Sequence, residues 1–410
     1  MFLYSIFIHI YHLLIRFASI FSEKARLWVR GRKKIFQIIS KKNISEEKIA
    51  WFHCSSLGEF EQGRPVMEGF RKHFPQYKIL LTFFSPSGYE VRKNFEGADY
   101  IFYLPLDTPA NVSRFLDLTK PDIAFFIKYE FWFNYIQSLN KRGIPLFFIS
   151  VNFRKTQHFF KWYGGWFRKQ LKNITHFFVQ NKESLALLHK IGIAQATVSG
   201  DTRFDRVYTI TNNLKTFPLI QKFCEGSDVF ITGSSWPPDE ELLVTLINSQ
   251  KTKYKFIIAP HLVDKPHIAS LVDKIKGHVI KYSDADKDNI KYAQILVIDS
   301  IGILSHVYQY GKIAYIGGGF GSSIHNILEA ATFGMPLIFG PKYNKFIEAI
   351  ELIKAGGAFS ICNEKEFMEC VYGLMNNPES LEKAGKIAKE YVKDNIGATE
   401  KILEHIKAII

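Results

Sequence analysis

The chain has 410 residues, of which 47% are hydrophobic and 22% charged, and its formal net charge at pH 7 is +14. This length exceeds what one core usually supports, so we expect two domains, and the apolar content excludes a disordered chain. The positive charge favours polyanionic partners, namely nucleic acid, an anionic membrane surface or a phosphorylated substrate. Four scattered cysteines without a C-x-x-C pair predict a reduced compartment and no structural zinc.

An apolar run at residues 2–21 has about the length that crosses a bilayer. His9, His12 and Arg16 recur at spacings of three and four, which predicts a helix with one polar face. Such a helix suits the membrane interface, or a short span with a snorkelling arginine, better than a clean span. Because the run lacks a basic n-region, we interpret it as a retained anchor rather than a secretory signal.

A basic segment follows the apolar run and predicts a collar against anionic lipid, with a solvated linker as the alternative. The cations of this basic collar are Lys24, Arg26, Arg30, Arg32, Lys33, Lys34, Lys41 and Lys42.

After residue 45, short apolar runs alternate with amphipathic segments, a pattern typical of βαβ units on parallel sheets. The strands expected in the first half are 49–54, 77–84, 122–127, 145–151 and 176–180, and those in the second half are 229–232, 255–259, 295–298, 313–316 and 336–339. We expect an anchor and collar at 1–44, a domain at 45–205, a linker at 206–227, and a second domain at 228–410 that ends in helices from Glu364 onward.

Residues 51–63, WFHCSSLGEFEQG, run from an apolar strand into a Gly-Glu turn at the start of a helix. Open α/β sheets bind ligands beyond the carboxyl ends of their strands, so Glu59 is a candidate general base. The alternative is a first-turn acid that complements the helix dipole. Residues 122–134 similarly bring a strand to Glu130 and then a helix carrying Trp132, and Glu130 has the same alternative as a helix-start acid.

A glycine-rich segment at 313–331 leads from a strand through Gly-Gly-Gly-Phe-Gly to a helix, which predicts a phosphate site. Glu329 falls three residues after Asn326, so its carboxylate can accept both hydroxyls of a ribose. A capping arrangement, with Asn326 at the N-cap and Glu329 at N3, needs no ligand, and both can hold. The loop at 233–236 is expected to help receive phosphate, or else only to turn the chain.

The turn Ser56-Leu57-Gly58-Glu59 closely resembles the signature of the Kdo transferases, which move 3-deoxy-D-manno-octulosonic acid (Kdo) from its CMP ester to the lipid A precursor. The resemblance implies Glu59 as proton acceptor. Residues 130–134 resemble the family's E-L-W-P-N block, with Phe133 where Pro is usual, and Gly200-Asp-Thr-Arg-Phe-Asp resembles G-x-x-K-F-D. Glu130 and Arg203 would then stabilise the transition state, with Arg203 replacing a lysine.

The resemblance also implies CMP-binding residues. His325 and the four residues after it resemble the family's H-N-P-L-E block, whereas two other blocks are altered. The family's P-R-H block appears here as Ala259-Pro260-His261, without the arginine, and its M-G-E block as Ile301-Gly302-Ile303, without the acidic residue. The charge opposite the phosphate and the affinity for the nucleotide are therefore left open. The implied CMP-binding residues are Pro260, His261, Ile301, Gly302, Ile303, Asn326, Ile327, Leu328 and Glu329.

The fold implied is α/β of the GT-B type, with two Rossmann-like domains facing a central cleft and an N-terminal membrane-associated helix. The reaction implied is an inverting transfer without metal or cofactor, and the chain has no D-x-D motif. The partners implied are CMP-Kdo, the lipid A precursor and the cytoplasmic face of the inner membrane.

Two alternatives remain open. A GT-B transferase or epimerase using a UDP-sugar would employ the same ribose-binding acid and glycine loop. A membrane-tethered nucleic-acid-binding protein would account for the charge of +14 but not for Glu59 and Glu329 at strand ends, and we find no basic-aromatic module of the known RNA-binding types. We therefore expect no nucleic-acid partner.

Overall fold

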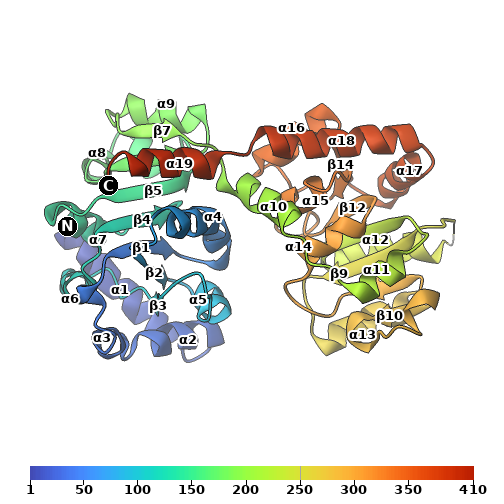
Figure 1. Ribbon diagram of the computed structural model, residues 1–410, viewed down its shortest axis with the longest axis horizontal. Helices are drawn as coiled ribbons and strands as arrows, with labels where there is room; N and C mark the ends of the chain where they lie inside the picture. Colours follow the sequence, from blue (N-terminus) through green and yellow to red (C-terminus); the bar gives the residue numbers. More distant parts are fainter. Residues whose placement is uncertain (250) are drawn as a thin grey trace. The chain divides into compact units, whose positions relative to one another are not determined.

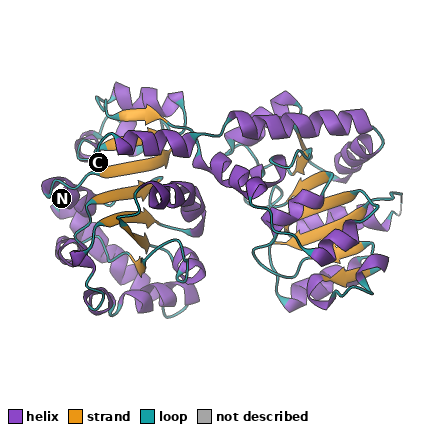
Figure 2. Ribbon diagram, viewed as in Figure 1, coloured by secondary structure: helices purple, strands orange, loops and turns teal. Residues whose placement is uncertain are grey.

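The computed structural model describes residues 1–249 and 251–410. They form two compact units: unit 1 comprises Met1–Arg206 and Ile396–Ile410, and unit 2 comprises Val207–Asn395. Each unit is a parallel sheet packed against helices (Figures 1 and 2). The boundary falls inside α10 (Thr202–Asn212), and the C-terminal helix α19 (Ala398–Lys407) belongs to unit 1. This division differs from the expected one, which placed a linker at 206–227 and the last helices in the second domain.

The sheet of unit 1 has the strand order β3-β2-β1-β4-β5-β6-β7, and its described strand pairs are parallel. The strands are β1 Ile49–Cys54, β2 Lys78–Phe83, β3 Tyr100–Tyr103, β4 Ile123–Ile127, β5 Leu146–Val151, β6 His176–Val179 and β7 Ala196–Val198. The five strands expected from the sequence are confirmed to within one residue at each end. The short edge strands β3 and β7 were not expected.

Helices cover both faces of this sheet because successive side chains of each strand point to opposite sides. They are α4 Leu57–His73, α5 Pro86–Arg92, α6 Pro109–Thr119, α7 Phe133–Lys141, α8 Gly165–Leu171 and α9 Lys182–Lys190, with the short 3₁₀ helix η2 at His158–Phe160. Trp51 and Phe126 lie in one buried cluster, whereas Phe52 and Phe125 lie in the cluster on the other face. The second cluster includes Leu403 of α19, so the C-terminal helix completes the core under α4.

The N-terminal segment forms α1 Phe2–Ala18, α2 Glu23–Arg32, α3 Ile35–Ser40 and η1 Ile44–Glu46. One face of α1 packs on unit 1, where the Tyr4 hydroxyl donates to Asp107 Oδ2 (2.6 Å) and Tyr11 stacks on Phe84. Burial raises the pKa of Asp107 to about 7. The opposite face is apolar and exposed, and it comprises Phe2, Leu3, Phe7, Ile10, Leu13, Leu14 and Phe17. Within the described part of the chain, every helix is too short or too polar to cross a membrane.

Arg32 departs from the expected collar because its guanidinium points into unit 1. It donates to the carbonyl oxygens of Phe84 (2.7 Å) and Leu104 (2.8 Å) and lies 3.9 Å from the ring centroid of Trp28. Burial lowers its pKa to about 9. Arg32 therefore joins α2 to the ends of β2 and β3, whereas the other collar cations are exposed.

The sheet of unit 2 has the order β10-β11-β9-β8-β12-β13-β14, and its described strand pairs are also parallel. The strands are β8 Val229–Ser235, β9 Lys255–Pro260, β10 Val279–Lys281, β11 Ile295–Val297, β12 Ile313–Ile316, β13 Leu337–Phe339 and β14 Ala358–Ser360. Gly233 to Ser235 continue β8, so the prediction of a loop there was wrong except at Trp236. The five expected strands are confirmed, and β10 and β14 at the edges are additional.

The helices of unit 2 are α11 Pro218–Cys224, α12 Pro237–Asn248, α13 Lys265–Lys274, α14 Leu304–Val307, α15 Leu328–Ala331, α16 Ile347–Ala355, α17 Glu364–Met375 and α18 Pro378–Asp394. Among the described residues of this unit, 3₁₀ turns occur at η3 Tyr282–Asp284, η4 Ile290–Tyr292 and η5 Tyr308–Tyr310. The prediction that the chain is helical after Glu364 is confirmed.

Candidate active site

Glu59 lies just beyond the carboxyl end of β1, in the first turn of α4. Ser56 is the N-cap of that helix, and Glu59 at N3 completes a capping box. Its Oε2 accepts hydrogen bonds from the backbone N–H groups of Ser55 and Ser56. The structural alternative for Glu59 therefore holds, and because both bonds use Oε2, they also fix the direction of the other carboxyl oxygen.

Glu130 lies in the loop between β4 and α7. It is 8% exposed, and its Oε2 accepts from Trp132 Nε1 (2.7 Å) and lies 3.2 Å from His53 Nε2. The alternative of a helix-start acid is wrong, because α7 begins at Phe133 with Trp132 as its N-cap. The Glu130 carboxylate thus lies beyond the end of β4 and is contacted there by the side chains of His53 and Trp132.

His53 connects Glu130 to the centre of the sheet. It is fully buried on β1, and its Nδ1 lies 2.9 Å from Thr82 Oγ1 and 3.1 Å from the Thr82 carbonyl oxygen. A proton on Nε2 donates to Glu130 Oε2 and leaves Nδ1 to accept from the Thr82 hydroxyl, and Trp132 Nε1 lies 3.1 Å from the same Nε2. His53 therefore orients the Glu130 carboxyl group and the Trp132 indole together.

The electrostatics of the site favour a protonated Glu59 at neutral pH. Burial, followed by the negative charge of Glu130, raises the pKa of Glu59 to about 8. The two amide hydrogen bonds and the cation of Lys128 act in the opposite direction. Lys128 directly follows β4 and has a φ of 63°, in the left-handed region that non-glycine residues rarely adopt. The pKa of Glu59 thus depends on the charges of both Glu130 and Lys128.

Arg203 lies in the first turn of α10 at the same edge of unit 1. Its Nε donates to Asp201 Oδ2 (2.9 Å), and Nη2 lies 2.7 Å from the same oxygen. Burial raises the pKa of Asp201, but the Arg203 charge outweighs it and the pKa is lowered. Lys128 contributes to the same lowering, so Arg203 and Lys128 form a positive region around Asp201.

The glycine-rich loop of unit 2 is held by close backbone contacts. A Cβ on Gly317 would lie 2.3 Å from the Ser234 carbonyl oxygen, and one on Gly319 would lie 2.6 Å from the Gly340 backbone. Asp239 in the first turn of α12 accepts from Gly318 N (2.9 Å) and from the Tyr315 hydroxyl (2.7 Å). The loop is therefore rigid, and the Gly318 amide already has a partner.

Three rings meet at the carboxyl edge of this second sheet. His261 stacks on Trp236 with ring centroids 4.5 Å apart and on His325 at 4.6 Å. The Trp236 indole donates to His325 Nε2 (3.0 Å). Burial lowers the pKa of both histidines, and that of His325 falls to about 4. Both imidazoles are therefore neutral at pH 7 and interact through stacking and hydrogen bonds.

The remaining residues predicted to bind the nucleotide differ in whether their side chains make hydrogen bonds or are buried in the core. Asn326 donates from Nδ2 to Glu329 Oε1 (3.1 Å) and accepts from Leu328 N, whereas Ile327 and Leu328 are buried in the core. The predicted cap differs by one residue, since the N-cap of α15 is Ile327.

Elsewhere in unit 2, Pro260 ends β9, Ile301 is 84% exposed, Gly302 has a φ of 93° and Ile303 is the N-cap of α14. Ile303, Ile327 and Leu328 therefore can offer a polar ligand only backbone groups.

Several residues of these clusters escaped the sequence interpretation. Lys128 had a usable signal, because a lysine that ends an apolar parallel strand reaches the ligand edge of the sheet. His53, Asp201 and Asp239 had none, since their importance depends on partners in other elements. Lys342, whose Nζ donates to the carbonyl oxygen of Gly321 (2.6 Å), adds a cation to the glycine-rich loop.

Residues 30–206 match the family model described as 3-deoxy-D-manno-octulosonic-acid transferase (kdotransferase). The 3-deoxy-D-manno-octulosonic acid transferase of Haemophilus influenzae is 25% identical over 370 residues, which cover 87% of this chain and 86% of that protein. The protein of the same name from Chlamydophila psittaci is 25% identical over 358 residues, or 83% and 80% of the two chains.

Solved structures resemble the fold at lower identity. The UDP-GlcNAc 2-epimerase of Neisseria meningitidis has a TM-score of 0.61 at 18% identity and covers 88% of this chain and all of its own. MurG of Acinetobacter baumannii has a TM-score of 0.54 at 12% identity, with 88% and 99% coverage. The fold is therefore that of two parallel α/β units, as in GT-B glycosyltransferases.

Proposed function

Since this chain belongs to the Kdo transferase family of glycosyltransferases, we propose that it transfers Kdo from CMP-Kdo to the lipid A precursor. The observation that carries the proposal is the placement of Glu59, a carboxyl group with a raised pKa beside Glu130 at the carboxyl end of a parallel strand.

The proposed step is a direct displacement with inversion. Glu59 takes the proton of the acceptor hydroxyl as that oxygen bonds to the anomeric carbon of Kdo. The bond from this carbon to the phosphate oxygen of CMP breaks, and its electron pair stays on the phosphate. Glu130 stabilises the oxocarbenium-like charge, and Arg203 and Lys128 offset the charge of the departing nucleotide. The step uses only side chains of this chain.

For the donor, we assign the nucleotide to the carboxyl edge of the sheet in unit 2. Glu329, oriented by Asn326, accepts the ribose hydroxyls, and the glycine-rich loop meets the phosphate. His261 and Pro260 lie at the end of β9, and the backbone of Ile301, Gly302 and Ile303 offers contacts to the base. Because the pKa of His261 is lowered by burial, it acts as a hydrogen-bonding group rather than as a cation.

For the acceptor, we assign the protein to the cytoplasmic face of the inner membrane. The exposed apolar face of α1, which includes Phe7 and Leu13, would enter the lipid, and the exposed cations of the basic collar would meet its phosphates. Binding to this surface confines the search for a lipid acceptor to two dimensions.

The test is transfer by the purified full chain to a tetra-acylated, bis-phosphorylated glucosamine disaccharide, with labelled CMP-Kdo or labelled UDP-N-acetylglucosamine as donor. We expect label in the lipid from CMP-Kdo alone, and a loss of roughly 10²–10⁴-fold in kcat for Glu59→Gln. Glu68→Gln is the matched control, since Glu68 lies exposed on the same helix and pairs with Arg64. Its rate should be unchanged.

Two results would overturn the proposal. Transfer or epimerisation with the UDP-sugar, without transfer from CMP-Kdo, would assign the chain to the alternative enzyme class. Native transfer by Glu59→Gln would exclude this residue as the base. Mass spectrometry of the lipid product counts the Kdo residues added.

A further inference from the structure

Unit 1 contains a groove of about 930 Å³ between α9, α8 and the segment that follows β5. This α9 groove is lined by Phe153, Lys155, Phe160, Arg168, Glu183, Ala186, Leu187, Lys190 and Ile191. Its volume lies within the range of about 300–1,000 Å³ that is usual for small-molecule sites. None of these residues belongs to the active site described above.

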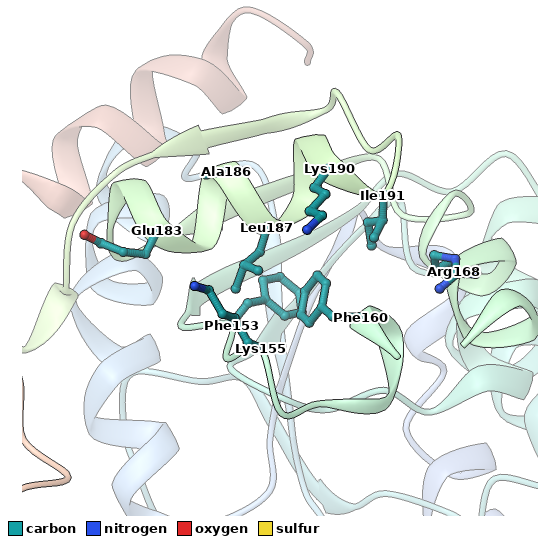
Figure 3. A pocket seen from close by; sticks show the side chains of 9 residues that line it. All are labelled: Phe153, Lys155, Phe160, Arg168, Glu183, Ala186, Leu187, Lys190 and Ile191. Carbon is teal, nitrogen blue, oxygen red and sulfur yellow. The ribbon is translucent and has the colours of Figure 1, made fainter. Parts of the chain in front are cut away.

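The lining combines an apolar floor with positive charge. Leu187 and Lys190 of α9, and Ile191 directly after it, lie on the side of the groove that faces the rings of Phe153 and Phe160 (Figure 3). Three cations, Lys155, Arg168 and Lys190, oppose one carboxylate, Glu183, which points away from the other lining side chains (Figure 3). An apolar body next to excess positive charge fits an amphiphile with an anionic group.

The cations remain available to a ligand. In the described part of the chain, no carboxylate lies within 4.0 Å of the charged nitrogens of Lys155, Arg168 or Lys190, the limit within which ion pairs such as that of Arg142 with Asp117 are found. Arg168 uses Nη1 for the carbonyl oxygens of Phe159 (3.1 Å) and Lys161 (3.0 Å). These bonds hold the guanidinium in place and leave further N–H donors on it.

One end of the groove, with Phe153 and Glu183, lies at the same edge of the sheet as Glu130, and the groove continues along α9 to Lys190. Phe153 follows the end of β5, and α9 follows β6, whereas Glu130 follows β4. These parallel strands are neighbours in the order β4-β5-β6, so roughly 5–10 Å of sheet separates the two places. The carboxyl ends of parallel strands meet at one edge, where ligands bind.

Two contacts connect the groove to the catalytic loop. Phe131, the residue after Glu130, packs against Phe153 with ring centroids 6.1 Å apart. The Tyr129 hydroxyl donates to the carbonyl oxygen of Asn152 (2.6 Å), directly before Phe153. These contacts place the groove next to the loop that carries Glu130.

We propose that the α9 groove is a subsite for the acceptor, in which an acyl chain lies on Phe153, Phe160 and Leu187 and a phosphate meets Lys190, with Lys155 and Arg168 adding positive charge along the groove. The inference rests on the proposed function for its ligand, a phosphorylated and acylated sugar. The groove would make the enzyme specific for acylated acceptors. An acceptor without acyl chains would lose its contact with the groove and keep its contact with Glu59 and Glu130.

A titration of the full chain with dodecyl phosphate, below its micelle concentration, tests the groove independently of catalysis. Ala186→Trp fills the groove from an exposed position of α9, and we expect at least tenfold weaker binding by calorimetry. His189→Trp places the same side chain at an exposed position of this helix outside the groove and should leave the affinity unchanged. Lys190→Glu should weaken dodecyl phosphate but not neutral dodecyl maltoside.

Unaltered affinity in Ala186→Trp would overturn the proposal. So would loss of binding in Leu13→Asp, since the amphiphile would then bind the exposed face of α1.

Kinetics separate this inference from the proposed function. We expect Ala186→Trp to raise KM at least tenfold for the tetra-acylated acceptor, with KM for CMP-Kdo and for the deacylated disaccharide unchanged. If the wild type and Ala186→Trp have equal KM values for the acylated acceptor, the groove is not an acceptor subsite, and the assignment of the chain as a transferase is unaffected. Wild-type protein that transfers to neither acceptor would refute the proposed function, and the titration would still decide whether the groove binds an amphiphile.

Discussion

At the scale of single residues, the site of unit 1 depends on a carboxyl group, Glu59, whose pKa is raised by burial and by the charge of a second carboxyl group. The two amide hydrogen bonds that Glu59 accepts lower its pKa. Burial and the negative charge of Glu130 raise it by more, so that the pKa is about 8. Such a carboxyl group is mostly protonated at pH 7, and the ionised fraction that can act as a base increases as the pH approaches the pKa. The enzyme should therefore be most active in mildly alkaline solution.

The pH profile of kcat/KM tests this coupling. For the wild type, kcat/KM should rise about tenfold per pH unit below pH 8 and then level off, since it follows the ionised fraction of Glu59 in the free enzyme. Glu130→Gln removes a negative charge, which makes ionisation of Glu59 easier and moves the midpoint to lower pH. The variant also loses roughly 10²–10³-fold in kcat through its own role. A midpoint that stays in place would show that Glu130 does not act on Glu59, and Glu68→Gln is the control.

Sequence alone can nominate candidate residues where a local motif marks the end of a strand. Glu59 and Glu130 were found because each follows an apolar strand. His53 was not found, because it reads as one more strand residue, and its partners Thr82 and Glu130 are 29 and 77 residues away. Only the pairing of β1 with β2 and β4 brings these three side chains together.

At the scale of elements, the glycine-rich loop after β12 shows why backbone packing decides a sequence motif. Gly317 is required by space, since a Cβ there would overlap the Ser234 carbonyl oxygen and lie 2.6 Å from Ser235 Cα. Gly373, inside α17, has no atom within 4 Å of an added Cβ. The two glycines therefore offer a matched pair of substitutions in one unit.

Gly317→Ala should lower the free energy of unfolding of unit 2 by about 1–3 kcal/mol, the usual cost of overpacking, and should weaken CMP binding. Gly373→Ala should raise it by about 0.5–1 kcal/mol, because alanine is favoured over glycine inside a helix. Urea denaturation and calorimetric CMP titration measure the two effects. Equal stability of the two variants would contradict the packing argument.

Element prediction succeeded for central strands and failed at the edges. β1, β4 and β12 are buried on both faces and are almost wholly apolar in sequence, and β8 begins with the apolar residues 229–231. β7 is only partly buried at its edge position, so it carries no apolar run by which sequence could reveal it.

At the scale of the whole molecule, positive charge and exposed apolar surface occur together near the N-terminus. α1 exposes Phe7 and Leu13, each 63% accessible, and the exposed cations of the basic collar follow in the next helices. Membrane binding would therefore combine insertion of apolar side chains with attraction to anionic lipid.

Sedimentation with lipid vesicles tests this combination. The full chain should bind vesicles that contain anionic phospholipid and bind weakly to zwitterionic ones, with affinity falling as salt rises. Phe7→Asp should weaken binding roughly tenfold or more, since burying a Phe side chain contributes about 1.5–3 kcal/mol. Ile347→Asp, an exposed apolar position in unit 2, should leave binding unchanged. Binding that is equal for both variants would exclude α1 as the contact.

The amino-acid sequence by itself determined the two-domain α/β class, the central strands and the positions of Glu59, Glu130 and Arg203, because apolar periodicity and short motifs are local properties. The tertiary structure alone decided that α19 completes the core of unit 1, that Arg32 points inward, and that His53, Lys128 and Asp201 join the site. Those outcomes depend on contacts between segments far apart in the chain, and no local pattern encodes which of several possible partners a side chain meets.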